Sequence, residues 1–463
     1  MLSAIDDLDP AATLARVESV VDRRRAVEIE DLQLIARWAD LHGDDPRRGP
    51  GGRRKWCGED RLVEIGGDGT PLVRELSLPE LAIARGCHTL ALRAAMADAL
   101  DLRHRLPQVW KVFLAGRCDA WVARKVAAMS RRLDRFQVAL VDAAVAEAIG
   151  GESPSRVFRI AEAKIIEADP AGHRARLEAE LRKRYVGCSA TDEFGLRVVL
   201  ARVEAGDAVW INAVVDQVAD ALAARPDLTP DLPADATKDE LRAVAFGWLA
   251  HPADVLDLLE QHQREPHSEP PAKQKPRRQR PQAVVFVHLH QAALEGCTAG
   301  VARVEDVGPM LLERLARLLG HSRIDLKPVI DLNTGASVNA YEHPESMKER
   351  SHLRNPGEVF PHASRMSRKV DHDHPNPYDE NGPPGQTRDD NDAPLGRTHH
   401  RSKTHLRYRV KQTALDQYRW ITPHGLVRRV DRTGTHRSDL GEACSEAVDD
   451  ALERLAAENR LTS

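Results

Sequence analysis

The segment LPQVWKVFLAGRCDAWVARKVAAMS, from Leu106 to Ser130, decides the class of fold that we expect. Apolar residues recur at three- and four-residue spacing on both sides of Gly116, which is typical of two short amphipathic helices joined by a glycine turn. Such a pair is either an ordinary αα-hairpin of a bundle or a helix-turn-helix, and the spacing leaves both interpretations open. Both predict a mainly α region.

The flanking sequence extends the helical pattern in both directions. Upstream, residues 10–43 have the periodicity of one long helix, and Ser77 followed by Pro79 and Glu80 predicts a second helix start. A strand is expected at 195–201. Further helices are expected over 154–182, 207–225 and 237–262, the last interrupted by a proline.

The composition supports a helical protein without a global preference for nucleic acid. Hydrophobic residues make up 42% of the 463 residues and aromatic residues only 4%, which favours bundle cores of Ala, Val, Leu and Ile. The formal net charge is −4, so any nucleic-acid-binding surface must be local. Neither a signal peptide nor a membrane-spanning apolar run is recognisable. We therefore expect a cytoplasmic protein with no membrane partner.

A proline-rich, charged segment divides the chain. Residues 263–282 have almost no apolar side chains and predict a disordered linker. Its basic run, Lys273 to Arg280, is compatible with a contact to nucleic acid and equally with a solvated linker that binds nothing. After the linker, His288 and His290 share one face of an expected strand, where surface or core histidines are favoured over a metal site. The elements expected here are a strand at 283–290, a helix at 308–321 and a short strand at 327–333.

From Phe360 onward, histidine, proline, asparagine and arginine become dense. MSRKVDHDH (366–374) predicts a strand and DENGPPGQTRDD (379–390) a turn-rich loop. Asp392 as N-cap and Pro394 in the first turn predict a short helix that contains two adjacent histidines. An aspartate from the strand and a histidine from the helix can hold a divalent cation, while a further histidine deprotonates water near neutral pH. This combination suits phosphodiester hydrolysis.

The spacing in this region resembles the HNH (ββα-metal) nuclease motif. His400 lies nine residues after Asn391 and begins a His-x-x-Lys sequence that ends at Lys403. The chain also resembles the actinobacterial DUF222 or 13E12-repeat proteins that carry a C-terminal HNH domain. The resemblance implies that Asp373 and His400 are the metal ligands, that His374 is the general base, and that Asn391 braces this base. Asp371 and His399 remain as supports of the site.

The resemblance also implies a domain organisation. A mainly α N-terminal region, a helical bundle with a few strands, precedes a small α+β ββα-metal domain. The expected boundaries are a DUF222-like region at 1–262, the linker at 263–282, the end of that region with a connector at 283–355, the HNH domain at 356–436 and a C-terminal helical tail at 437–463.

Two departures from the family pattern stand out. Relatives often carry cysteines around the motif, where this chain has residues such as Val370 and Gly396, so no structural zinc is expected. Asp392 replaces an apolar residue at the helix entry, where it either caps the helix or loosens the packing behind the site.

The sequence therefore predicts a metal-dependent HNH endonuclease that hydrolyses DNA with one divalent cation. Mg²⁺ is the first choice, and Mn²⁺, Ni²⁺ or Zn²⁺ would also suit these ligands. The cations expected to contact DNA phosphates are Arg397, Arg401, Lys403 and Arg407. Alternatives are a non-catalytic DNA- or partner-binding protein with a vestigial motif, or a purely structural metal site. The oligomeric state and the DNA target stay open.

Overall fold

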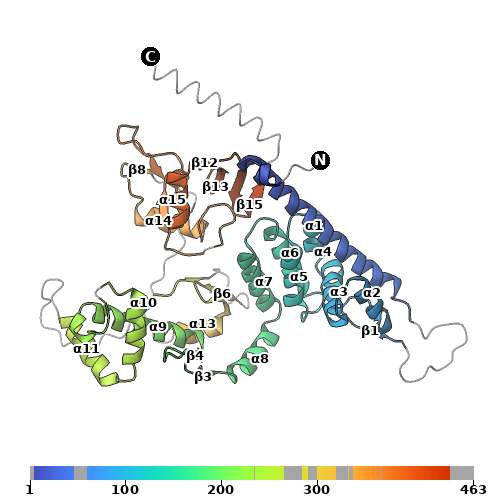
Figure 1. Cartoon of the computed structure of the whole chain (residues 1–463), viewed down its shortest axis with the longest axis horizontal. Coiled ribbons are helices and arrows are strands. Elements are labelled where there is room, and N and C mark those ends of the chain that lie inside the picture. Colours follow the sequence, from blue (N-terminus) through green and yellow to red (C-terminus); the bar gives the residue numbers. More distant parts are fainter. Residues whose placement is uncertain are drawn as a thin grey trace, which may run out of the picture. The chain divides into compact units, whose positions relative to one another are not determined.

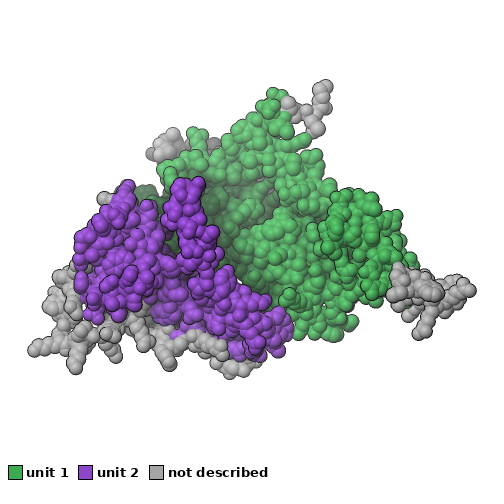
Figure 2. Space-filling model, turned by 60° about the horizontal axis from the view of Figure 1, so that its bottom comes forward, with its two compact units in different colours: residues 1–168, 326–463 green, residues 169–325 purple. Residues whose placement is uncertain are grey.

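The computed structural model describes residues 5–45, 60–233, 235–264, 284–289, 300–319, 332, 337–364 and 366–437. The chain forms two compact units. One consists of residues 1–168 and 326–463, and the other of residues 169–325 (Figure 2). The fold is mainly α with small antiparallel sheets (Figure 1). Within the described ranges, no helix is long and apolar enough to cross a membrane.

The first unit contains a helical bundle with one long helix packed along it (Figure 1). Asp9 caps the long helix by accepting a hydrogen bond from the backbone N–H of Ala12 at 2.7 Å. A short antiparallel pair, β1 (Leu62–Val63) and β2 (Val73–Arg74), precedes the second helix. The helices are α1 (Pro10–Leu41), α2 (Leu78–Ala84), α3 (Thr89–His104), α4 (Pro107–Leu114), α5 (Ala120–Ser130), α6 (Val138–Ala148) and α7 (Pro154–Ala168).

The bundle core has the predicted composition. Helices α4 and α5 form an αα-hairpin whose turn places Gly116 at a φ of +68°, a conformation that favours glycine. Both helices bury their apolar faces in the bundle, and α4 contributes the fully buried Phe113. Ser77 stands at the start of α2 as expected, but its hydroxyl donates to the carbonyl of Arg74 and does not cap the helix.

The second unit also combines helices with small sheets. Residues 308–311, predicted as the start of a helix, instead form strand β7, because Gly308 adopts a φ of +111° and the segment pairs with β6. Its elements are α8 (Pro170–Leu181), β3 (Tyr185–Cys188), β4 (Val199–Arg202), α9 (Ala205–Ala223), α10 (Lys238–Trp248), α11 (Pro252–Arg264), β5 (Val287–His288), β6 (Val301–Val304), β7 (Gly308–Leu311) and α13 (Leu312–Leu319). His288 hydrogen bonds Glu305 at 2.6 Å.

The C-terminal part of the first unit is built from short strands around two helices. Strand β9 pairs antiparallel with β11, β10 pairs with β8, and the last four strands form one antiparallel sheet in sequence order. The elements are β8 (Ser337–Val338), α14 (Glu345–Arg354), β9 (Asp371–Asp373), β10 (Thr387–Arg388), η4 (Asp389–Asn391), β11 (Ala393–Leu395), α15 (Arg397–His405), β12 (Arg409–Ala414), β13 (Gln417–Ile421), β14 (Val427–Asp431) and β15 (Gly434–Arg437).

Several predicted features fall on residues that the structure does not describe. Helix α11 continues to Arg264, so the first two residues of the predicted linker at 263–282 belong to this helix. The rest of that linker with its basic run, His290, the expected strand at 327–333 except residue 332, and the tail beyond residue 437 lie outside the described residues.

Candidate functional site

The candidate site is built on the antiparallel pair β9 and β11 and on the helix α15 that follows. In this pairing Asp373 lies opposite Ala393 and Asp371 lies opposite Leu395. Successive side chains of a strand point to opposite faces, so the two aspartates share one face of β9 and His372 takes the other. The aspartates contact α15, and His372 contacts Asp392.

His400 lies between the two aspartates. Its Nδ1 is 2.8 Å from Asp371 Oδ2, and its Nε2 is 3.7 Å from Asp373 Oδ1. An ionised carboxylate can only accept, so Nδ1 carries a proton, and in the neutral ring the lone pair of Nε2 then faces Asp373. Partial burial opposes ionisation of Asp371, but its hydrogen bonds with His400 and Arg397 hold its pKa below the usual value.

This arrangement suits a cation with two protein ligands. The described residues contain no group of three or more His, Cys, Asp or Glu side chains that could hold a metal ion. Asp373 Oδ1 and His400 Nε2 nevertheless offer one oxygen and one nitrogen donor across a gap of 3.7 Å. A carboxylate behind the far nitrogen, as Asp371 is here, orients a histidine ligand and raises its basicity. Water and substrate oxygens would have to supply the remaining positions.

Lys403 ties the helix to the strand. Its Nζ lies 2.8 Å from Asp373 Oδ2 as an ion pair and donates a hydrogen bond of 3.0 Å to the backbone carbonyl of His374. The side chain is only 17% exposed, so Lys403 lies within the site and not on the outer surface of α15. Lys403 therefore contacts both the predicted metal ligand Asp373 and the backbone of the predicted general base His374.

His374 is buried, and its tautomer follows from its partners. Its Nε2 is 2.9 Å from the hydroxyl of Thr387, which itself donates to the carbonyl of Ala340. A hydroxyl has one proton, so Thr387 must accept from Nε2–H, and Nδ1 keeps its lone pair. Burial, and next the neighbouring His343, lower the pKa of His374, which favours the neutral imidazole.

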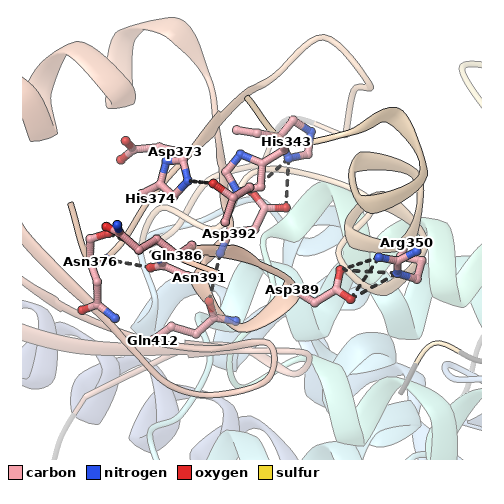
Figure 3. A network of polar contacts seen from close by, with 12 residues as sticks. His343, Arg350, Asp373, His374, Asn376, Gln386, Asp389, Asn391, Asp392 and Gln412 are labelled. Atoms are coloured by element: carbon pink, nitrogen blue, oxygen red, sulfur yellow. Dashed lines mark hydrogen bonds and ion pairs between the residues drawn. The ribbon is translucent and has the colours of Figure 1, made fainter. Parts of the chain in front are cut away.

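Asn391 braces the loop that follows His374. Its side-chain oxygen accepts from the N–H of Asn376 at 2.8 Å, and its amide nitrogen donates to the carbonyls of Asn376 and Gln386 at 3.1 and 3.0 Å (Figure 3). Asn391 is 3% exposed, so these bonds replace those that water would supply. The bracing thus acts on the backbone two residues beyond His374.

The family model described as a domain of unknown function, DUF222, matches residues 69–350, which is more than half of the chain. The chain belongs to the DUF222 family. No curated protein and no solved structure matches it.

The DUF222 match ends before β9, yet its last residues reach the site. The backbone of Ala340 accepts the hydroxyl of Thr387, and the ring of His343 lies 4.4 Å from that of His374, measured between centroids. Arg350 pairs with the buried Asp389 at 3.1 Å (Figure 3). The end of the DUF222 region and the Asp-His segment therefore form one packed structure.

A buried polar cluster behind the site was not predicted from the sequence. It consists of the buried His343 and Asp392 (Figure 3) and of the half-buried His372. His372 Nδ1 lies 3.0 Å from both carboxylate oxygens of Asp392, and His343 Nε2 lies 3.8 Å from Oδ1. The pKa of His343 is lowered, and burial is the main cause. The sequence signal for this cluster was Asp392, an acid at a position where the family pattern has an apolar residue.

The prediction that Asp392 caps a helix with Pro394 in its first turn was wrong. Residues 393–395 form β11, where proline is tolerated because this strand pairs on one side only. Helix α15 begins at Arg397, and Glu358, distant in sequence, accepts the N–H of Gly396 at 2.7 Å. Asp392 is 1% exposed and its carboxylate bonds His372, so it does not leave an unsatisfied charge behind the site.

The remaining predicted residues lie around α15. His399 hydrogen bonds Glu358 at 2.6 Å and stacks on Phe360 with the centroids 4.0 Å apart, so it does not join the two aspartates. Arg397 is highly exposed and donates to Asp371 at 2.9 Å. The other predicted phosphate contacts, Arg401 and Arg407, are exposed.

Proposed function

We propose that this DUF222 protein is a metal-dependent endonuclease of the HNH type that hydrolyses DNA phosphodiester bonds. The observation that carries the proposal is the placement of His400, which presents the lone pair of Nε2 to Asp373 while Asp371 holds Nδ1. The order of an antiparallel strand pair followed by a helix, β9, β11 and α15, agrees with a ββα-metal arrangement.

Each residue then has a distinct task. Asp373 and His400 would hold one divalent cation, with Mg²⁺ first and Mn²⁺, Ni²⁺ or Zn²⁺ as further candidates. When bound, such a cation neutralises charge on the phosphate and on the departing oxygen. His374 takes a proton from the attacking water through Nδ1, because Nε2–H is held by Thr387. Asn391 keeps the loop after this base in place.

DNA as the substrate is supported by the charges around α15. Arg397 and Arg401 lie on the helix and Arg407 follows it, and all three are exposed. Cations beside a phosphodiesterase site bind the backbone without reading the base sequence. We therefore expect cleavage with little sequence preference from these contacts.

A nicking assay on supercoiled plasmid with Mg²⁺ or Mn²⁺ tests the proposal. The parent protein should nick, and His374→Ala should lose at least about 100-fold in rate, since general base catalysis typically contributes that much. His400→Ala should also lose activity, because it removes a proposed metal ligand. His399→Ala is the matched control, because this neighbouring histidine contacts Glu358 and not the aspartates. Calorimetric titration with Mn²⁺ should show binding that His400→Ala weakens and His399→Ala preserves.

One observation favours a second candidate, a non-catalytic DNA-binding protein with a vestigial motif. The ammonium of Lys403, 2.8 Å from Asp373, already balances the charge of the predicted ligand. Under this reading the parent and His374→Ala bind DNA equally and neither nicks plasmid with any of the four metals. That result would replace the nuclease proposal.

A further inference from the structure

Two tyrosines lie beside the proposed general base His374. The ring centroids of Tyr341 and Tyr378 are 5.7 and 5.8 Å from that of His374, and they are 5.5 Å from each other. The two tyrosine rings meet edge to face at an interplanar angle of 82°, which is a favourable geometry for an aromatic pair. The chain has only five tyrosines in 463 residues, so two of them at one histidine form a local concentration of aromatic rings.

The three rings differ in their exposure. Tyr341 is 69% exposed, Tyr378 is half-buried and His374 is 5% exposed. A tyrosine ring carries a large apolar area, and leaving most of it in water gives up the stabilisation that burial would supply. Packing of the core therefore does not account for Tyr341, the most exposed of the three rings.

The backbone that carries Tyr341 is held on both sides. The residue before it, Ala340, accepts the hydroxyl of Thr387 through its carbonyl. Two residues after it, His343 is 3% exposed and its ring lies 4.4 Å from that of His374. Because a tyrosine side chain has only two χ angles and this backbone is already fixed, little conformational freedom is lost when a flat ligand covers the ring.

The position of Tyr341 indicates which flat ligand it would bind. Asp373, a proposed metal ligand, directly precedes His374, so a phosphate bound at the metal and the aromatic rings would be neighbours. The base on the sugar next to such a phosphate is itself an aromatic ring, and proteins commonly hold unpaired bases by stacking them on tyrosine. In a duplex the neighbouring bases cover both faces of each base, so only an unpaired base can offer a face to Tyr341.

We propose that Tyr341, supported by Tyr378, is a stacking platform for an unpaired nucleobase next to the phosphodiester bond that is cleaved. The substrate class is therefore DNA with an unpaired base at the cleavage site, of which a single strand is the simplest case. Stacking tolerates every base, because each has a π-face, and so it adds affinity without sequence preference. The proposal rests on the proposed function for DNA as the ligand and for the position of its phosphate.

Fluorescence anisotropy with labelled strands of about 20 nucleotides tests the platform. Binding is measured in EDTA, so that hydrolysis does not interfere, to a single strand, to the same strand with abasic sites throughout, and to the matching duplex. Tyr341→Ala should weaken binding to the single strand by about 5- to 150-fold in Kd, as for the loss of one stacked base. Binding to the abasic strand and to the duplex should change by less than about 2-fold, because these probes offer phosphates but no free base face.

Two further variants serve as controls for Tyr341→Ala. Tyr341→Phe keeps the ring and should bind the single strand within about 3-fold of the parent. Phe136→Ala removes a ring that is 75% exposed next to α6 of the helical bundle, and it should leave all three affinities unchanged. If Tyr341→Ala unfolds, as circular dichroism would show, Tyr341→Leu keeps an apolar side chain beside Tyr378 and should show the same selective loss.

The outcomes separate this platform from the nuclease function. The platform is overturned if the parent does not bind the single strand, if Tyr341→Ala leaves that affinity unchanged, or if the variant loses the abasic strand as strongly as the complete one. A parent that shows the predicted binding pattern but never nicks plasmid with Mg²⁺ or Mn²⁺ would refute the nuclease function alone. A parent that nicks plasmid, and whose Tyr341→Ala variant binds all three probes normally, would refute the platform alone.

Discussion

The helical bundle and the strand pair of the candidate site are held together in different ways. In the bundle, helix α3 alone buries nine residues, among them Leu92, Met96 and Leu100, each fully inaccessible to solvent. In the candidate site, α15 has no buried residue and the three residues of β9 are all half-buried. The side chains of β9 and α15 are held by hydrogen bonds and ion pairs, whereas β11 beside them is buried in an apolar cluster. Burial of apolar surface is non-directional, whereas these polar contacts require specific partners.

The bundle also contains one polar anchor, and its removal should have the largest effect. Asp101 is fully buried and contacts Arg105 at 3.1 Å, Arg131 at 2.6 Å and the N–H of Gly67 at 2.7 Å. Asp101→Ala leaves buried Arg105 without this partner and should lower the free energy of unfolding by about 3–5 kcal/mol. Urea denaturation followed by circular dichroism measures the change.

The control for this variant is Asp40→Ala, which removes a more exposed ion pair with Arg103. That change should cost less than about 1 kcal/mol, because water screens the pair and solvates the remaining charge. Equal costs for the two variants would mean that the buried anchor has no special role in the bundle.

The next largest effect concerns apolar burial in α3. Leu100→Ala, at a position with 0% exposure, should lower the free energy of unfolding by about 3 kcal/mol through lost transfer energy and a cavity. Leu90→Ala in the same helix, where the side chain is 69% exposed, should change it by less than about 0.5 kcal/mol. A similar loss for both, measured by urea denaturation, would contradict the description of α3 as the centre of the core.

Removal of a polar brace in the site should have a smaller and more local effect. Asn391→Ala loses three hydrogen bonds and should cost about 1–3 kcal/mol, mainly by freeing the loop around Asn376. Hydrogen exchange of the Asn376 amide should accelerate, and plasmid nicking should fall with it. Asn381→Ala, at an exposed position of the same loop, is the control. Unchanged protection of Asn376 would show that Asn391 does not brace this backbone.

The smallest effect is expected at the start of α15. Glu358→Ala removes the acceptor for Gly396 N–H and for His399, and should cost about 1 kcal/mol, as for the loss of a helix cap. Nicking should be largely retained, because Glu358 contacts neither Asp373 nor His374. Thermal denaturation and the plasmid assay together check both parts. Abolished nicking at unchanged stability would place Glu358 in the catalytic machinery.

Much of the fold follows from local sequence signals. The apolar period of residues 10–43 predicted the long helix, which the structure gives as Pro10–Leu41, and Gly116 marked the turn between α4 and α5. These signals succeed because helix formation and turn geometry depend on neighbours within a few residues. The expected helix start at Asp392 failed because residues 393–395 pair with β9 and the N–H of Gly396 finds its acceptor in Glu358.

The sequence by itself determined that the protein is mainly α, and it named Asp371, Asp373 and His400 as residues of one candidate site. Only the tertiary structure decided what each side chain contacts. His400 meets both aspartates, His372 turns to Asp392, and His343 from the DUF222 region packs against His374. The physical reason is that a hydrogen bond or ion pair depends on distances of a few ångströms between residues far apart in sequence, which no local periodicity encodes.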